Sequence, residues 1–317
     1  MKAFKFLSNT ALVFSLALLA SCSSNDDLEP ASDVKPASNK VVEFTANLGS
    51  SETAVDSSKD TLNLSKATRA TLERNNDVHW DLGDRLYVFC DNYEYAGLFS
   101  ITPSSIDGKT AKFTNFENEL PNGFEAKEFY YALYPFGAAT FNINTSMITS
   151  VLTANQKVTE GCTYDKNALV MVACADCNDK TFNFKNIPAL IKINVSNNAD
   201  GKVKYIKIAA KNTANRLSGN FRASVNYSTD QLVLETISDA DSRNTVRLQI
   251  PATDESKDFY IAALPGTLNN GFTIIFEDEK GNAVYERTTK KGASADLKSS
   301  KIYPFGSYDV AKFPTKE

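Results

Sequence analysis

The sequence predicts an all-β protein, and three observations indicate this fold class. Apolar and polar residues alternate with a period of two in many short segments, which is typical of strands with one face in a core and one in water. Turn sequences rich in Gly, Asn and Asp separate these segments. No window of helical length keeps apolar residues at the i, i+3, i+4 and i+7 positions that an amphipathic helix requires.

The amino end has the pattern of a bacterial lipoprotein signal. Lys2 and Lys5 form a short basic region, an apolar run follows, and small residues precede Cys22. We expect residues 1–21 to be removed as a signal peptide and Cys22 to carry the lipid. A plain secretory signal with a chance cysteine is the alternative. The apolar run is too short for a transmembrane helix.

Residues 22–40 are expected to form a disordered tether. They consist mainly of Ser, Asn, Asp, Ala and Pro, which cannot bury enough apolar surface to form a core. No segment after them is long and apolar enough to span a membrane. Folding is therefore expected from residue 41 onward.

The first strand is predicted at residues 41–48, because Val42, Phe44, Ala46 and Leu48 alternate with polar residues. A polar segment, residues 63–76, follows it and contains two arginines, Arg69 and Arg74. No apolar run in this segment would hold it to a core. It is either an ordinary surface loop or a site of proteolytic cleavage.

The rest of the chain continues as short strands, every eight to twelve residues, which is the spacing of β-sandwiches. The length that remains for folding predicts two domains, 41–179 and 180–317. Fuller apolar runs are expected to form central strands, at residues 85–89, 128–134, 168–173, 258–264 and 272–276.

Composition and motifs argue against several function classes. The net charge is −4 and no basic stripe is present, so we do not expect nucleic acid as a partner. The sequence contains no phosphate-binding glycine loop, no GxSxG elbow and no HExxH zinc motif. The one histidine, His79, is expected to be a structural residue at a strand edge. We therefore predict no enzyme activity, no metal and no cofactor.

Cys174 and Cys177 have the CxxC spacing. A zinc site would need more ligands than the sequence offers nearby, and a thioredoxin-like site would need a helix after the motif. A structural disulfide between the two cysteines, or burial as thiols, is the expected alternative.

Several segments together resemble the fimbrillins of Bacteroidales. The first half contains Phe44–Leu48, then the Thr-Arg-Ala loop within Lys66–Thr71, and then the Trp-x-x-Gly-Asp strand of Val78–Phe89. The second half is similar in its Phe182–Val195 and Lys301–Gly306 segments. The order of these segments, together with the lipoprotein signal, carries the resemblance.

This resemblance implies two tandem transthyretin-like β-sandwich domains and a subunit of a cell-surface pilus. The precursor would be a surface-exposed lipoprotein of the outer membrane, anchored through Cys22. A trypsin-like protease would cut between Arg69 and Ala70, with Arg74 as the second choice. The cut would release the first strand, and a strand from another pilus subunit would replace it.

The final residues bear on the role in the pilus. Stalk subunits of this family end in an extension that acts as a donor strand, whereas residues 307–313 are expected to complete the last strand of the second domain. We therefore expect a tip or accessory subunit. The alternative function is an uncut surface lipoprotein that binds a glycan or protein ligand.

Overall fold

A computed structural model of the chain describes residues 41–48, 52–53, 79–115, 120, 124–290 and 293–314. The described residues belong to one compact unit. Their regular structure consists of β-strands and the short 3-10 helices η1 (Pro103–Ser105), η3 (Lys166–Ala168) and η4 (Val310–Lys312). In this part of the chain, no helix has the length and apolar character needed to cross a membrane. The predicted all-β fold class is confirmed.

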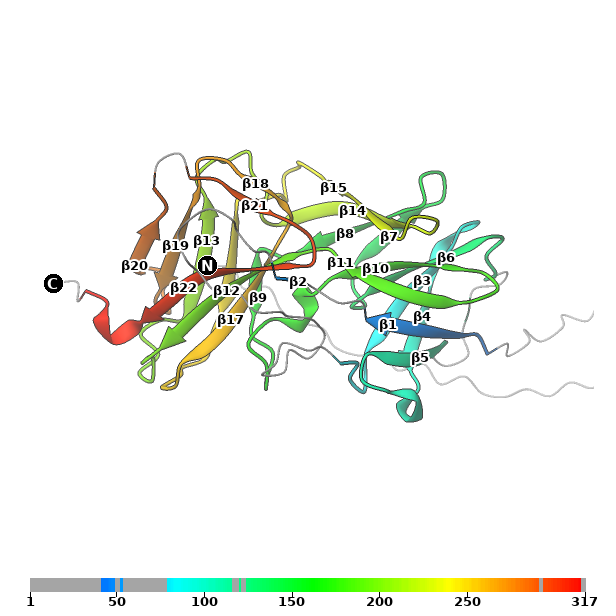
Figure 1. Cartoon of the computed structure of the whole chain (residues 1–317), viewed down its shortest axis with the longest axis horizontal. Coiled ribbons are helices and arrows are strands. Elements are labelled where there is room, and N and C mark those ends of the chain that lie inside the picture. Colours follow the sequence, from blue (N-terminus) through cyan, green and yellow to red (C-terminus); the bar gives the residue numbers. More distant parts are fainter. Residues whose placement is uncertain are drawn as a thin grey trace, which may run out of the picture. The chain divides into compact units, whose positions relative to one another are not determined.

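Seven strands close into a barrel in the order β1-β11-β10-β6-β3-β4-β5 (Figure 1). A sandwich is expected in this half from the sequence. The structure is all-β, as expected, and the ring closes because β1 pairs with both β5 and β11. The strands of the barrel are β1 (Glu43–Leu48), β3 (Arg85–Cys90), β4 (Tyr93–Ile101), β5 (Thr110–Asn115), β6 (Phe129–Tyr134), β10 (Met171–Asp176) and β11 (Thr181–Asn186).

A four-stranded sheet packs against the outside of this barrel. Its order is β15-β14-β8-β7, and its strands are β7 (Ala139–Asn142), β8 (Met147–Leu152), β14 (Gly219–Asn226) and β15 (Gln231–Thr236). One apolar cluster joins Phe141 and Phe221 of the sheet to Leu133 and Val172 of the barrel. Outward-facing residues of the barrel are therefore also buried, which explains the nearly continuous apolar runs in β6 and β10.

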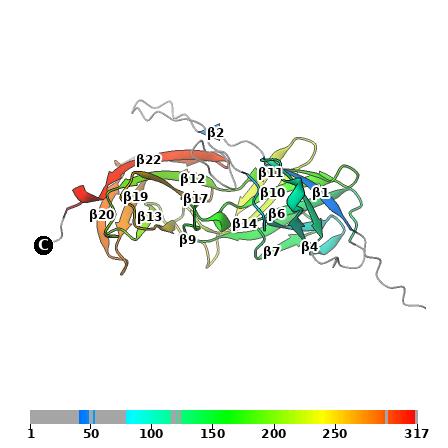
Figure 2. The same ribbon diagram turned by 90° about the horizontal axis from the view of Figure 1, so that it is seen from below.

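Two further sheets enclose the core of the second half. Ile191 and Phe259 from one sheet share an apolar cluster with Ile208 and Phe276 from the other, and Figure 2 shows β12 and β22 as one layer, with β13 and β19 in the other. The first sheet, in the order β17-β12-β22-β2, contains β17 (Lys257–Ala263), β12 (Ala189–Ser196), β22 (Lys301–Asp309) and β2 (Glu52–Thr53). The second, in the order β20-β19-β13-β16-β9, contains β20 (Ala283–Thr288), β19 (Phe272–Glu277), β13 (Tyr205–Ala210), β16 (Thr245–Gln249) and β9 (Asn155–Lys157). A small pair, β18 (Gly266–Leu268) and β21 (Ala295–Leu297), completes the described strands.

The two halves of the sequence share strands. β11 follows Asp179 in the chain, yet it closes the barrel beside β1. β14 pairs with β8 of the first half, and β9 of the first half pairs with β16 of the second. A division of the chain at Asp179 into two transthyretin-like domains stays a prediction, and it would separate these strands from their partners.

Candidate functional site

The first strand is the candidate site, because it is a member of the closed barrel that precedes the predicted cut in the sequence. β1 runs antiparallel to β5 from Glu43 to Asn47 and parallel to β11 from Thr45 to Leu48. Both of its edges are therefore paired. We call the surrounding groups that contact β1, on β4, β5, β6 and β11 and at Trp80, the seat of the strand.

The inward face of β1 is buried along its whole length. The exposed fractions of Val42, Phe44, Ala46 and Leu48 are 4%, 0%, 0% and 6%. These are the four residues that the alternation of the sequence places toward the core. Burying a Val, Leu or Phe side chain contributes about 1.5–3 kcal/mol relative to leaving it in water, so the inward face is the main hold on the strand.

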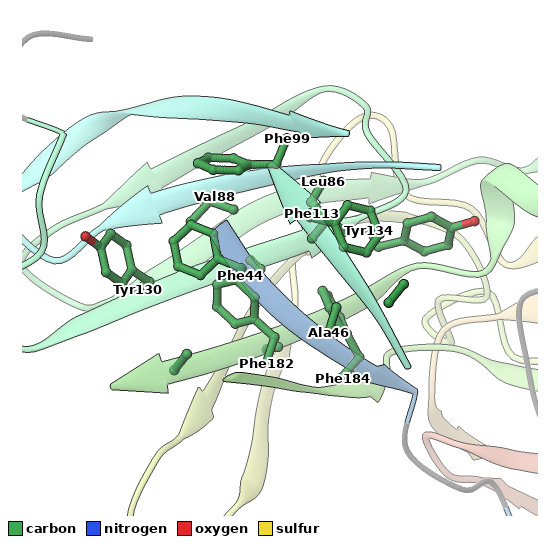
Figure 3. Packing of buried hydrophobic residues seen from close by; sticks show 14 of the residues in the cluster. Phe44, Ala46, Leu86, Val88, Phe99, Phe113, Tyr130, Tyr134, Phe182 and Phe184 are labelled. Atoms are coloured by element: carbon green, nitrogen blue, oxygen red, sulfur yellow. The ribbon is translucent and has the colours of Figure 1, made fainter. Parts of the chain in front are cut away.

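Phe44 lies in an aromatic pocket at the centre of the barrel. Figure 3 shows its ring among those of Phe99, Tyr130 and Phe182, which come from β4, β6 and β11. The ring centroids lie 5.0, 4.9 and 4.9 Å from that of Phe44, the first two edge-on and the third stacked. Such pairs add about 0.5–1.5 kcal/mol each beyond the buried area.

Trp80 donates a hydrogen bond to the backbone of β1. Its indole Nε1–H lies 3.0 Å from the carbonyl oxygen of Ala46, in a buried environment. The indole packs edge-on against Phe113, Tyr134 and Phe184, at centroid distances of 5.0, 5.2 and 5.8 Å. Trp80 is the only tryptophan of the chain, so its fluorescence reports on the occupancy of the seat.

Asn115 holds the start of β1. The backbone N–H of Val42 donates to Asn115 Oδ1 at 2.8 Å, and the N–H of Asn115 donates to the carbonyl oxygen of Val42 at 3.4 Å. Asn115 and Trp80 thus contact the strand at two points, four residues apart. The sequence analysis missed Asn115, because an Asn at a strand end carries no local signal of its partner.

The outward face of β1 is polar and only weakly held. Lys112 Nζ lies 2.7 Å from Glu43 Oε1, but about half of each side chain is exposed. Exposed ion pairs contribute roughly 0–1 kcal/mol. Asn47 donates to Asn183 Oδ1 at 3.1 Å and accepts from the Thr110 hydroxyl at 2.9 Å. These contacts face water, so they add little to the stability of the strand.

The Asp84 carboxylate stabilises the turn that follows Trp80. Asp84 accepts hydrogen bonds from the Asp81 backbone N–H at 2.8 Å and from the Tyr134 hydroxyl at 2.9 Å. Burial raises the pKa of the Asp84 carboxyl above its ordinary value. Burial and the neighbouring Asp84 charge raise the pKa of Tyr134, so its hydroxyl keeps the proton that it donates. Lys166 forms an ion pair with Asp81.

The predicted lipidation and cleavage residues lie outside the described part of the chain. These are Cys22, Arg69, Ala70 and Arg74. β1 ends at Leu48, and the described residues that lead into the next barrel strand begin at His79. In sequence, the predicted cut lies between these two points.

The suggested disulfide between Cys174 and Cys177 is not formed. All four described cysteines, Cys90, Cys162, Cys174 and Cys177, are free thiols. Cys174 belongs to the cluster outside the barrel, whereas Cys177 packs against the cluster inside it. The two side chains therefore point to opposite sides of the sheet, as expected for positions three apart along an extended chain.

Buried thiols in this half are poor nucleophiles. Burial raises the pKa of Cys90 and Cys174 to about 12, and the thiolate is the reactive form. Among the described residues, no group of three or more His, Cys, Asp or Glu side chains could hold a metal ion.

Comparison with solved structures gives matches over most of the chain. A candidate cell adhesion protein from Bacteroides ovatus is 16% identical, with 87% of this chain and 94% of that chain covered and a TM-score of 0.44. A candidate cell adhesion protein from Bacteroides uniformis is 14% identical, with 86% and 95% covered and a TM-score of 0.44. A fimbrial assembly protein from Parabacteroides distasonis is 11% identical, with 84% and 91% covered and a TM-score of 0.35.

All three neighbours come from species of Bacteroides or Parabacteroides. No protein-family model matches the chain, and no curated protein matches it.

Proposed function

We propose that this chain is a subunit of a cell-surface fimbria whose first strand is removed and then replaced by a strand of another subunit. The observation that carries the proposal is that β1 alone joins β5 to β11. Its removal would open the barrel at one place and create two unpaired edges there. As a structural subunit, the protein would need no catalytic group.

The open seat would be strongly unfavourable in water. Each buried N–H or C=O group left without a partner costs about 1–3 kcal/mol, and bared apolar surface costs about 25 cal/mol per Å². The pocket around Phe44 and the two strand edges would be exposed together. An extended segment of another subunit would offset both costs at once, by strand addition.

The order of the segments along the chain suits such a release. β1 and the lipid-bearing Cys22 lie before the proposed cut at Arg69, whereas Trp80 and the other barrel strands lie after it. A trypsin-like protease that cuts there would separate the body from the lipid and from β1. The body could then leave the outer membrane and enter a fibre.

The last strand favours an accepting role, at the tip or as an accessory subunit. Tyr308, Val310 and Phe313 are buried in the core of the second half. The rings of Phe313 and Tyr285 stack with their centroids 4.4 Å apart. Donating this segment to a neighbour would therefore open a core that it now completes.

The mature amino terminus tests the proposal directly. We expect mass spectrometry of the protein from its native cell surface to find a chain that starts at Ala70 and carries no lipid. The Arg69→Ala variant should fold but keep β1, and Arg74→Ala is the matched control. A mature protein that starts at lipidated Cys22 would instead support an uncut surface lipoprotein that binds a glycan or protein ligand.

A further inference from the structure

We propose that the seat selects the register in which an incoming strand binds. It accepts an extended segment that has an aromatic residue at the position of Phe44 and a residue no larger than alanine at the position of Ala46. This inference rests on the proposed function, because it describes the strand that another subunit would supply. Trp80 is the residue that enforces the small side chain.

The two positions differ sharply in the room that they offer. Phe44 lies opposite Phe113 of β5, and rings of β4, β6 and β11 surround it. Ala46 lies opposite Ala111 of β5, and both alanines are fully buried. Along the β1–β5 pair, an aromatic layer at Phe44 is therefore followed by an alanine layer at Ala46, and on the other side β11 places Phe182 beside Ala46.

Trp80 closes the alanine layer. Its indole is hydrogen-bonded to the Ala46 carbonyl oxygen and wedged against Phe113, Tyr134 and Phe184. Ala46 and Trp80 belong to the same buried cluster, so a larger side chain at position 46 would need room in a core that these rings already fill. Protein cores resist such added volume, because packed rings cannot move independently.

The difference in size between these two positions disfavours binding of the incoming strand in a register shifted by two residues. A slip of one residue turns every apolar side chain toward water, but a slip of two keeps the inward and outward faces correct. In this seat, a slip of two in one direction would place Phe44 in the alanine layer and Val42 in the aromatic pocket. A slip of two in the other direction would place Leu48 in the alanine layer and Ala46 in the pocket. In either direction, the larger residue overpacks the alanine layer and the smaller one leaves a cavity in the pocket.

A first experiment uses the uncut full chain and compares Ala46→Leu with Thr45→Leu. Thr45 is the matched control, because its side chain lies on the outward face of the same strand. We expect Ala46→Leu to lower the melting temperature by roughly 3–10 °C relative to Thr45→Leu. Equal melting temperatures would show that the alanine layer has room and would overturn the inference.

A second experiment nicks the full chain with trypsin between Leu48 and His79, verifies the cut by mass spectrometry, and adds a synthetic peptide of residues 41–49. Exchange is followed by Trp80 fluorescence. We expect the native peptide and its Thr45→Leu form to displace the resident strand, and the Ala46→Leu peptide to bind at least roughly tenfold more weakly. Equal binding of the three peptides would overturn the register reading and leave strand exchange standing. A nicked chain that exchanges with none of them would count against the proposed function, and the melting temperatures would still decide the register reading.

Discussion

The first and last long strands of the described chain, β1 and β22, differ in how regularly they are paired. β1 keeps an uninterrupted register with a neighbour on each side. β22 pairs with β12, but its register shifts between Lys192 and Asn194, where Pro304, Phe305 and Gly306 disturb the ladder. On its other side it meets only the two-residue strand β2.

The two strands therefore differ in what an incoming segment would have to reproduce under the proposed function. For β1 this is a regular pairing on both sides and the buried side chains of its inward face. β22 depends on a local shape: Gly306 has a φ of 113°, which residues with a side chain rarely adopt. Phe305 stacks on Phe272 with centroids 4.2 Å apart.

The largest loss of stability is expected from a substitution on the buried face of β1. Phe44→Asp should destabilise the uncut protein by more than about 4 kcal/mol, because it places an unpaired charge in the aromatic pocket and removes its contacts. Chemical denaturation measures the loss. Thr45→Asp, on the outward face, is the control and should change stability by less than about 1 kcal/mol. If Phe44→Asp melts like the wild type, the seat does not hold β1.

A smaller loss of stability is expected when the hydrogen bond from Trp80 to β1 is removed. Trp80→Phe should cost about 2–3 kcal/mol, because it leaves the Ala46 carbonyl without its side-chain donor and leaves part of the indole volume empty. Denaturation followed by circular dichroism measures this change, since the variant lacks the tryptophan signal. Tyr93→Phe is a suitable control for a change of aromatic residue at the rim of the same core. A loss no larger than in this control would show that Trp80 does not anchor the strand.

A substitution at the irregular part of β22 tests whether its local shape stabilises that strand. Gly306→Ala should cost about 1–2 kcal/mol, because alanine is strained at this positive φ. Ser307→Ala, at the exposed neighbouring position, should be nearly neutral. Thermal melting of both variants measures the difference. Equal stability would mean that the irregular shape of β22 is not what fixes it in place.

The smallest effect concerns the surface of β1. Glu43→Gln should change stability by less than about 0.5 kcal/mol, because the ion pair with Lys112 is half exposed and screened by salt. Denaturation at low and high salt checks this expectation. A loss above 1 kcal/mol at low salt would indicate that charge, as well as the buried face, holds the strand.

Much of the candidate site follows from local sequence pattern. The alternation around Phe44 identifies both a strand and its buried face, since successive side chains of a strand point to opposite sides. The Trp-x-x-Gly-Asp motif also draws attention to Trp80. Its partner, the Ala46 carbonyl, lies 34 residues away in sequence, and no periodicity within either segment indicates that contact.

Other features depend on contacts that no local pattern contains. The free thiols of Cys174 and Cys177 lie on opposite sides of a sheet whose two faces are both buried. The sequence alone left a disulfide and burial as thiols both open there, because CxxC spacing does not show which face each side chain takes.

By itself, the sequence determined that the chain is all-β and which face of each alternating strand is apolar, because both are properties of neighbouring residues. Only the tertiary structure decided that β1 lies between β5 and β11, that β14 joins β8, and that the Trp80 indole donates to the Ala46 carbonyl. The physical reason is that strand pairing is chosen by packing between distant segments, where the volumes of side chains must match across a closed core.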